Sequence, residues 1–200
     1  WEKLRIGDVC TKIGSGATPR GGAASYQTEG ISLIRSLNVY DYNFHDEGLV
    51  FINEQQADKL SNVTIESRDV LINITGASVA RCCIAQDRHL PARVNQHVMI
   101  LRPIQNKVCS EYLLCAINSE RQKQLILSIA RAGGATREAL TKDTVANIQI
   151  VIPSSHLMTV FREFALKNFV QIETFQQHNV ALSKARDLLL PRLMNGEIQA

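Results

Sequence analysis

Two glycine-rich segments place threonine and arginine side chains on a flexible backbone, a combination that can hold phosphate. The first spans residues 14–22 (GSGATPRGG) and the second spans residues 131–137 (RAGGATR). Glycines let main-chain amides approach a phosphate closely, while arginine and threonine supply side-chain donors. Neither segment contains the Gly-Lys-Ser/Thr sequence of a nucleotide-binding phosphate loop. The alternative is that these glycines only allow tight turns.

The distribution of charged side chains along the sequence indicates an anionic partner more strongly than the net charge does. The 200 residues carry a net charge of only +3. Residues 35–80 contain three basic and seven acidic side chains, whereas residues 81–137 contain nine basic and three acidic ones. Most of these bases are arginines, whose planar fork suits phosphate and guanine edges, so a polyanion such as nucleic acid is a plausible partner. A basic face that only contacts solvent would have the same composition.

Short apolar runs predict a mixed α/β domain over residues 1–153 that would position these segments. Strands are predicted at residues 31–35, 69–75, 79–85, 97–102 and 147–152. The Gly-Ala-Ser sequence at 76–78 predicts a hairpin between the second and the third. A short helix is predicted at residues 54–60 and a longer one at 110–130, capped by Ser110. Apolar residues recur at helical spacing in the longer one, at Leu113, Leu114, Ile117, Leu125 and Ile129. Strands outnumber helices and the crossovers are irregular, which favours a mixed sheet over a doubly wound one.

Residues 154–200 predict one long amphipathic helix followed by a short tail. Positions spaced alternately three and four apart are mostly apolar over about five heptads. They are Met158, Phe161, Ala165, Asn168, Ile172, Phe175, Asn179, Leu182, Arg186, Leu189 and Leu193. A helix from residue 154 to residue 190 would be about 55 Å long, and Pro191 is expected to end it.

A helix of this length is expected to pair with another long helix rather than to close the core of one small domain. The residues expected to carry this pairing are Phe161, Ile172, Phe175, Leu182 and Leu189. Asn168 and Asn179 interrupt the apolar series, as polar residues that set the register of a coiled coil do. The alternative is that the apolar stripe packs inside a single domain.

Several kinds of site are not predicted. The five cysteines form no C-x-x-C pair and the five histidines have no metal-binding spacing, so we expect a reduced, cytoplasmic protein without a metal site. No apolar run reaches the length of a membrane span. Asp8, Glu29 and Asp69 are isolated carboxylates, expected to be caps or surface charges. There is no amino-methyltransferase motif, methyl-donor loop or ATPase phosphate loop, so no catalytic centre is expected.

The order of several short motifs resembles the specificity subunits of type I restriction–modification systems. The motifs are WEKLRIGDVC at residues 1–10, GSGATP at 14–19, DVLINITGASVARCCIA at 69–85, NQHV at 95–98, GGATREALTKDTVANIQIVIPS at 133–154 and ARDLLLPRLMNGEI at 185–198. Each motif is weakly specific alone, but the ordered set extends over nearly the whole chain.

The resemblance implies a DNA-recognition subunit without catalytic activity. Such subunits carry two target recognition domains, each followed by a helix, and the two helices pair antiparallel as a spacer. Each domain recognises half of a bipartite target on double-stranded DNA, and modification subunits dock on the spacer and bring restriction subunits with them. S-adenosylmethionine, and ATP with Mg²⁺ for restriction, are expected on those partners, and no cofactor is expected on this chain.

One domain with one helix corresponds to half of such a subunit. The chain would be either the C-terminal half of a longer subunit or a short chain that dimerises antiparallel about a two-fold axis. In the second case its target would be palindromic around a spacer. Two rivals remain open: the recognition fragment of a single-chain restriction–methylation enzyme, and a helical scaffold protein without DNA affinity.

Recognition of DNA would combine phosphate contacts with contacts to base edges. The candidate residues lie in the glycine-rich segments, at the end of the strand near residue 35, in the predicted hairpin and just before residue 97. They are Ser15, Thr18, Arg20, Arg35, Ser36, Asn38, Thr75, Ser78, Arg81, Asn95, Gln96, Arg131, Thr136 and Arg137. Asn95 and Gln96 could equally form an internal hydrogen-bonding pair that holds two strands together.

Overall fold

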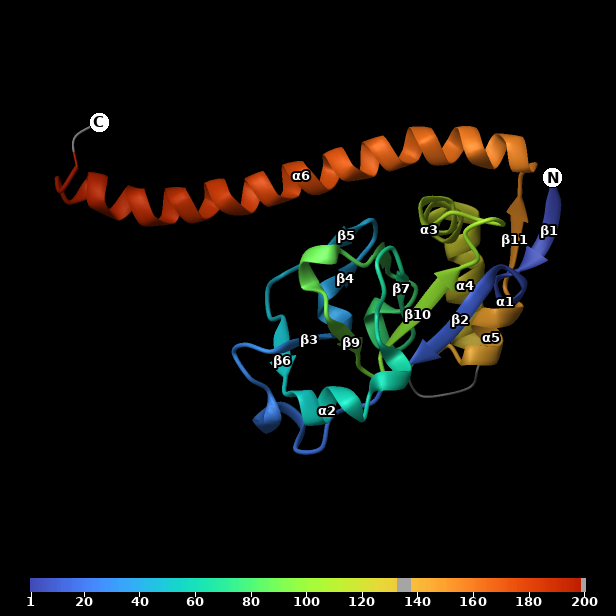
Figure 1. Ribbon diagram of the computed structural model, residues 1–200, viewed down its shortest axis with the longest axis horizontal. Coiled ribbons are helices and arrows are strands. Elements are labelled where there is room, and N and C mark those ends of the chain that lie inside the picture. The colour runs from blue at the N-terminus through green and yellow to red at the C-terminus, as the bar shows by residue number, and fades with distance from the viewer. Residues whose placement is uncertain (133–137, 199–200) are drawn as a thin grey trace. The chain divides into compact units, whose positions relative to one another are not determined.

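The structure is a computed structural model that describes residues 1–132 and 138–198. It divides into two compact units, Trp1–Thr159 and Val160–Ala200 (Figure 1). The strands all lie in the first unit: β1 (Glu2–Arg5), β2 (Cys10–Ser15), β3 (Ile31–Ile34), β4 (Val39–Tyr40), β5 (Asn43–Phe44), β6 (Val50–Ile52), β7 (Val70–Asn73), β8 (Cys82–Ile84), β9 (Ala92–Val94), β10 (Val98–Pro103) and β11 (Gln149–Ile152). The helices are α1 (Ile6–Val9), α2 (Glu54–Asp58), α3 (Ser110–Asn118), α4 (Glu120–Ala132), α5 (Lys142–Asn147) and α6 (Ser155–Met194).

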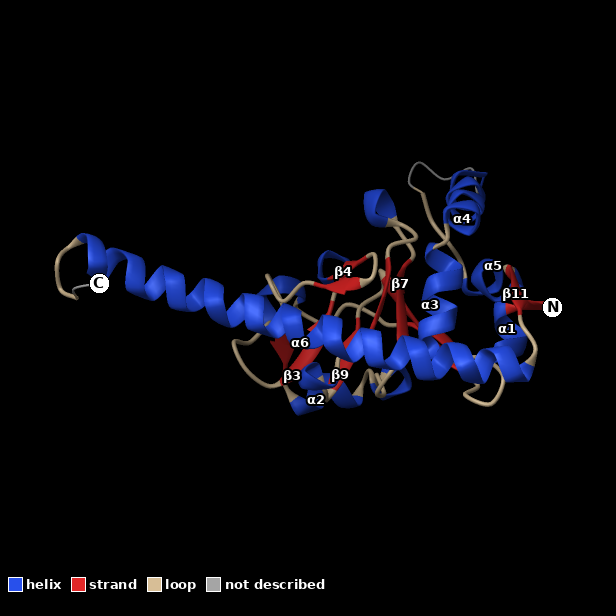
Figure 2. Cartoon of the chain, turned by 90° about the horizontal axis from the view of Figure 1, so that it is seen from above, coloured by secondary structure: helices blue, strands red, loops and turns tan. Residues whose placement is uncertain are grey.

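The first unit is built from several small sheets rather than one large one (Figure 2). Strands β2, β10, β7 and β8 form an antiparallel sheet in that order. Strand β3 pairs antiparallel with β6 and parallel with β9. Two further pairs, β1 with β11 and β4 with β5, are antiparallel. The mixed α/β fold with a long C-terminal helix is therefore confirmed.

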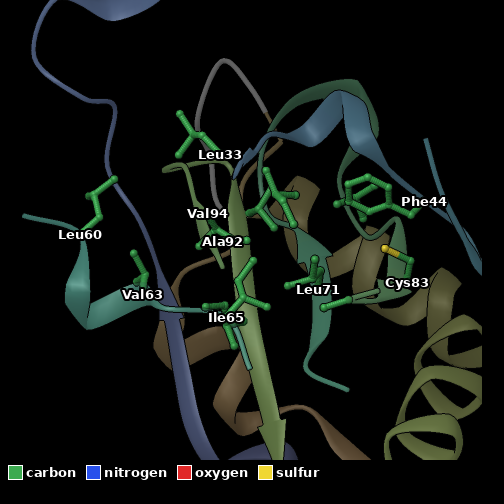
Figure 3. Packing of buried hydrophobic residues seen from close by; sticks show 14 of the residues in the cluster. Leu33, Phe44, Leu60, Val63, Ile65, Leu71, Cys83, Ala92 and Val94 are labelled. Carbon is green, nitrogen blue, oxygen red and sulfur yellow. The ribbon is translucent and has the colours of Figure 1, made fainter. Parts of the chain in front are cut away.

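The four-stranded and the three-stranded sheets share one hydrophobic core. Leu33 on β3, Val94 on β9 and Leu71 on β7 pack in one cluster (Figure 3). Ile100 on β10 belongs to the same cluster. These four side chains are fully buried, and each such burial stabilises the fold by about 1.5–3 kcal/mol. The chain passes from one sheet to the other between β9 and β10. Residues 95–97 therefore lie at the junction of the two sheets.

The strands predicted from the apolar runs are found as β3, β7, β8, β10 and β11, and the short helix is found as α2. The hairpin between β7 and β8 is also confirmed, with residues 76–78 forming a 3₁₀ turn. The prediction that the last strand begins at Asn147 is wrong, because this residue ends helix α5 and β11 begins at Gln149. Thr141 starts that helix by accepting a hydrogen bond from the Thr144 amide at 3.1 Å.

The single helix predicted over residues 110–130 is wrong, because the structure has two helices there. Ser119 adopts an extended backbone (φ −60°, ψ 140°) between α3 and α4, which ends the first helix. The break changes which residues of the second helix face inward. Ile126 and Ala130 are buried, whereas Leu125 is 47% exposed. Ser110 is also not the cap, since it is the first helical residue after Cys109.

Helix α6 contains 40 residues, which corresponds to about 60 Å at 1.5 Å per residue. It continues through Pro191, so the prediction that this proline ends the helix is wrong. Gly196 ends it instead, with a φ of 71° that favours glycine. The Gly196 amide donates to the Leu193 carbonyl at 3.2 Å and the Glu197 amide donates to the Arg192 carbonyl at 2.9 Å. These two hydrogen bonds together form the Schellman motif, which is common at helix C-termini. No helix in the described part of the chain is both long and apolar enough to span a membrane.

Candidate nucleic-acid interface

Gly16 brings the first glycine-rich segment against the junction of the two sheets. Its amide donates to the Asn95 carbonyl oxygen at 3.0 Å. A Cβ atom built on Gly16 would lie 1.7 Å from the Val94 carbonyl oxygen, far inside any permitted contact. Only glycine allows this approach without moving the backbone. The segment after β2 is thereby held next to residues 95–97.

A string of side-chain hydrogen bonds then joins three loops. The Thr18 hydroxyl donates to Gln96 Oε1 at 2.6 Å. Gln96 Nε2 lies 3.0 Å from His97 Nε2, and His97 Nδ1 lies 2.6 Å from Thr75 Oγ1. Thr18 and Gln96 are exposed, and Thr75 and His97 are partly buried. Three of the predicted residues, Thr18, Thr75 and Gln96, therefore form one polar surface, and hydrogen bonds to the His97 ring connect it.

The hairpin loop after β7 also holds the residues that follow the second glycine-rich segment. The Gly76 amide donates to the Glu138 carbonyl at 2.9 Å, and the Leu140 amide donates to the Ile74 carbonyl at 2.8 Å. Arg131 Nε pairs with Glu138 Oε1 at 2.9 Å, which links the two ends of that segment. The candidates Thr136 and Arg137 lie outside the described residues. Of the residues that flank these two, Glu138 bonds to the hairpin loop and Arg131 pairs with Glu138.

A cleft of about 860 Å³ lies beside the hairpin loop. It is lined by Asp41, Gly76, Ala77, Val79, Arg81, Lys123, Leu127, Arg131 and Glu138. Two of its cations are in ion pairs, Lys123 with Asp41 and Arg131 with Glu138. The Arg81 guanidinium instead lies over the Tyr40 ring, 4.5 Å from its centroid. Among the described residues Arg81 forms no ion pair, so its charge is the one in this cleft most available to an anionic ligand.

The candidates at the end of β3 have internal roles. Asn38 is completely buried, and its side-chain amide donates to the His45 carbonyl at 2.9 Å. Arg35 Nη2 donates to the Gly48 carbonyl at 2.5 Å, and its guanidinium lies over the Tyr26 ring. The Ser36 carbonyl accepts from Asn73 Nδ2 at 2.9 Å. These contacts show that a strand end next to a loop can turn its polar groups inward to close the loop itself.

The remaining candidates differ in burial: one is buried, two are partly buried and one is exposed. Asn95 is buried, and its Oδ1 accepts from the His97 amide at 3.0 Å, so it shapes the turn rather than facing a ligand. Ser15 is the last residue of β2, opposite Met99, and Ser78 ends the 3₁₀ turn. Both are partly buried. Arg20 is exposed in the first glycine-rich segment, two residues after Thr18.

Part of the arginine-rich stretch belongs to the interior. Arg102 donates from Nε and Nη2 to the two carboxylate oxygens of Asp69, each at 2.8 Å. Asp69 is 1% exposed, so the expectation of a cap or surface charge is wrong for it. Arg93 donates to the Ala57 carbonyl at 3.1 Å. The nine basic residues counted between 81 and 137 therefore overstate the charge available to a polyanion.

Sequence reasoning missed two residues that line the cleft, Asp41 and Lys123, and the Tyr40 ring beneath Arg81. Tyr40, Asp41 and Lys123 come from segments far from the hairpin in sequence, and nothing in their spacing marks them. His97 stood inside a noted motif, but only the fold shows that its ring bridges Gln96 and Thr75. A long-range contact of this kind has no local sequence signal.

The described residues show no metal-binding cluster, and burial keeps at least two of the thiols protonated. No three His, Cys, Asp or Glu side chains among them come together as metal ligands would. Burial raises the pKa of Cys83 to about 12, and burial followed by the charge of Asp69 raises the pKa of Cys10 to about 12. These two thiols are therefore protonated at neutral pH. The chemistry offered by the surface is hydrogen bonding and ion pairing.

Comparisons with known proteins match this chain to one family. The model of the type I restriction modification DNA specificity domain matches residues 1–156. The HindI specificity subunit of a type I restriction enzyme from Haemophilus influenzae is 23% identical over 198 residues, which cover 99% of this chain and 42% of that protein. The MjaIX specificity subunit from Methanocaldococcus jannaschii is 23% identical over 199 residues, covering 100% of this chain and 44% of that protein.

A solved structure shows the same fold. The S subunit of a type I restriction–modification system from M. genitalium matches with a TM-score of 0.67 and 15% identity, over 96% of this chain and 45% of that chain. This chain thus spans less than half the length of each of these relatives. Since the family model covers more than three quarters of its residues, the chain belongs to the type I restriction modification DNA specificity domain family.

Proposed function

We propose that this chain recognises one half of a bipartite sequence on double-stranded DNA. It would form half of the specificity subunit of a type I restriction–modification complex. This complex would act in the cytoplasm. The observation that carries this proposal is the family match over residues 1–156, which includes every loop of the polar surface. Both curated relatives are named as specificity subunits, which favours a separate subunit over part of a single-chain restriction–methylation enzyme. Methylation and cleavage would then belong to partner subunits, which would bind S-adenosylmethionine, ATP and Mg²⁺.

The polar surface offers both kinds of contact that DNA recognition requires. Arg20 and Arg81 would contact phosphates, because both carry charge at the surface of loops that a polyanion can reach. Thr18, Thr75 and Gln96 would contact base edges, since each is fixed by the hydrogen-bonded string. Rigid attachment favours binding, because a side chain held in place loses less conformational entropy when it contacts DNA.

Helix α6 would supply the spacer and the docking surface for partner chains. Phe175 is 57% exposed and Leu182 is 66% exposed, and Ile172 and Leu189 are also exposed. An exposed apolar stripe on a helix this long is expected to be covered by a second helix, from the same subunit or from a twin chain. Leu157, Val160 and Phe164 are exposed outside that series. They would contact the modification subunits, which in turn hold the restriction subunits.

The test is DNA binding by the full chain assembled with its modification subunits. Fluorescence anisotropy at low salt would compare duplexes of random sequence with duplexes enriched by selection. Arg20→Ala and Arg81→Ala are each expected to weaken binding by about tenfold, because each removes a phosphate contact. Lys59→Ala, which removes an exposed positive charge near α2, is the matched control and should change binding by less than about twofold. Absence of any DNA binding by the assembled complex would refute the proposal.

A further inference from the structure

The string that joins Thr18, Gln96, His97 and Thr75 has a direction that is set by the orientation of the Gln96 side-chain amide. The Gln96 amide nitrogen can only donate, so His97 Nε2, 3.0 Å away, must accept. A neutral imidazole with an accepting Nε2 carries its proton on Nδ1, which then donates to Thr75 Oγ1. The hydrogen of the Thr18 hydroxyl is used on Gln96 Oε1. Toward solvent, Thr18 can therefore only accept, while Thr75 retains a hydrogen to donate.

Protonation of His97 would reverse half of this pattern. An imidazolium donates from both nitrogens, so Nε2 could no longer accept from Gln96. The Gln96 amide would have to turn its oxygen toward His97 and its nitrogen toward Thr18. Thr18 Oγ1 would then accept from Gln96, and its hydrogen would be free to point outward. Both threonines would become donors.

We propose that His97 is a positioning residue that sets whether Thr18 accepts from or donates to DNA, and thereby sets base preference. The inference rests on the proposed function, because it takes this surface to be the one that contacts DNA. In the major groove adenine N6 and cytosine N4 are donors, whereas guanine O6 and N7 are acceptors. An accepting Thr18 fits an adenine or cytosine amino group. A donating Thr18 fits guanine or thymine, whose major-groove edges offer acceptors and no donor, or a phosphate oxygen.

The groups bonded to the His97 ring, Gln96 and Thr75, are both neutral. The charged groups on the elements that carry the string are Arg20 in the first glycine-rich segment, Arg81 in the β7–β8 hairpin, and Glu138 beside Gly76. Glu138 is paired with Arg131, so its charge is compensated. Bound DNA would add negative charge on this surface, which favours the protonated ring.

The experiment is selection of bound sequences from a random duplex library at two pH values, about 8 and about 5.5, on either side of the ordinary imidazole pKa of about 6.5. The protein is the full chain assembled with its modification subunits. At one base pair the enriched base should change from adenine or cytosine toward guanine or thymine on acidification. The affinity ratio for that pair should change by about tenfold, as expected for gaining one hydrogen bond and losing another.

Two variants and one control assign the change to the string. His97→Gln bears no titrating ring, and Thr18→Val bears no hydroxyl, so either should select the same sequence at both pH values. His178→Gln, on the exposed surface of α6, should behave like the unmodified chain. A pH-independent preference in the unmodified chain, or a shift that survives in His97→Gln, would overturn the inference and leave the proposed function standing. Failure to enrich any sequence at either pH would overturn both.

Discussion

At the scale of single residues, Gly16 is the position on which the polar surface most directly depends. Its amide bonds to Asn95, and there is no room for a side chain between it and the Val94 carbonyl. Gly14, two residues earlier on β2, has open space where its Cβ would be. Glycine is therefore sterically required at position 16 but not at position 14, although both belong to the same short motif.

Gly16→Ala should lower the free energy of unfolding by about 2 kcal/mol or more, because the new methyl group must displace backbone atoms. Gly14→Ala is the matched control and should change stability by less than about 0.5 kcal/mol. Urea unfolding followed by circular dichroism measures both. Equal stability of the two variants would show that the loop does not approach Val94 as closely as described.

Individual residues also show how far sequence reasoning reaches. Thr18, Thr75 and Gln96 were candidates from their place in loops, and the fold brings all three together. Asn38 was a candidate for the same reason, yet it is buried and bonds to its own loop. A polar residue beside a strand end can either stay at the loop surface or turn inward and bond to its own loop. Which one it takes depends on long-range packing that the local sequence does not record.

At the scale of elements, helix α6 was the most predictable part of the chain and α3 with α4 the least. The heptad series of α6 extends over many turns, so a local periodicity determines the helix without tertiary information. In α3 and α4 the same periodicity suggested one helix. Ser119 interrupts it where Asn118 donates to the Cys82 carbonyl at 3.1 Å on strand β8, a contact made only in the fold.

Leu182→Lys should weaken self-association of the chain by at least about tenfold, because it places a charge in the apolar stripe. Ser183→Lys adds the same charge at the adjacent exposed position outside the series, and should leave association unchanged. Sedimentation velocity measures the effect, with circular dichroism confirming that α6 remains helical. A strictly monomeric unmodified chain at high concentration would favour pairing with a second helix of the same longer polypeptide.

At the scale of the whole molecule, the arrangement of partners determines the symmetry of the DNA target. If two copies of this chain pair antiparallel, the two recognition units are related by a two-fold axis. The selected sequence should then be palindromic, with two inverted copies of one half-site around a spacer of constant length. If the chain is instead half of a longer subunit, the two half-sites should differ. Sequencing of the selected duplexes distinguishes these outcomes, and a spacer of variable length would contradict a rigid α6 pair.

The amino-acid sequence by itself determined the family, the mixed α/β class, most of the strands and the long helix. These follow from periodicity, turn residues and short motifs, all of which are local or ordered along the chain. Only the tertiary structure decided which glycine is sterically required, which arginines are internal, and that His97 joins three loops. Each of these depends on contacts between residues tens of positions apart. Such contacts form because two sheets share one core, and the chain must cross between them at residues 95–97.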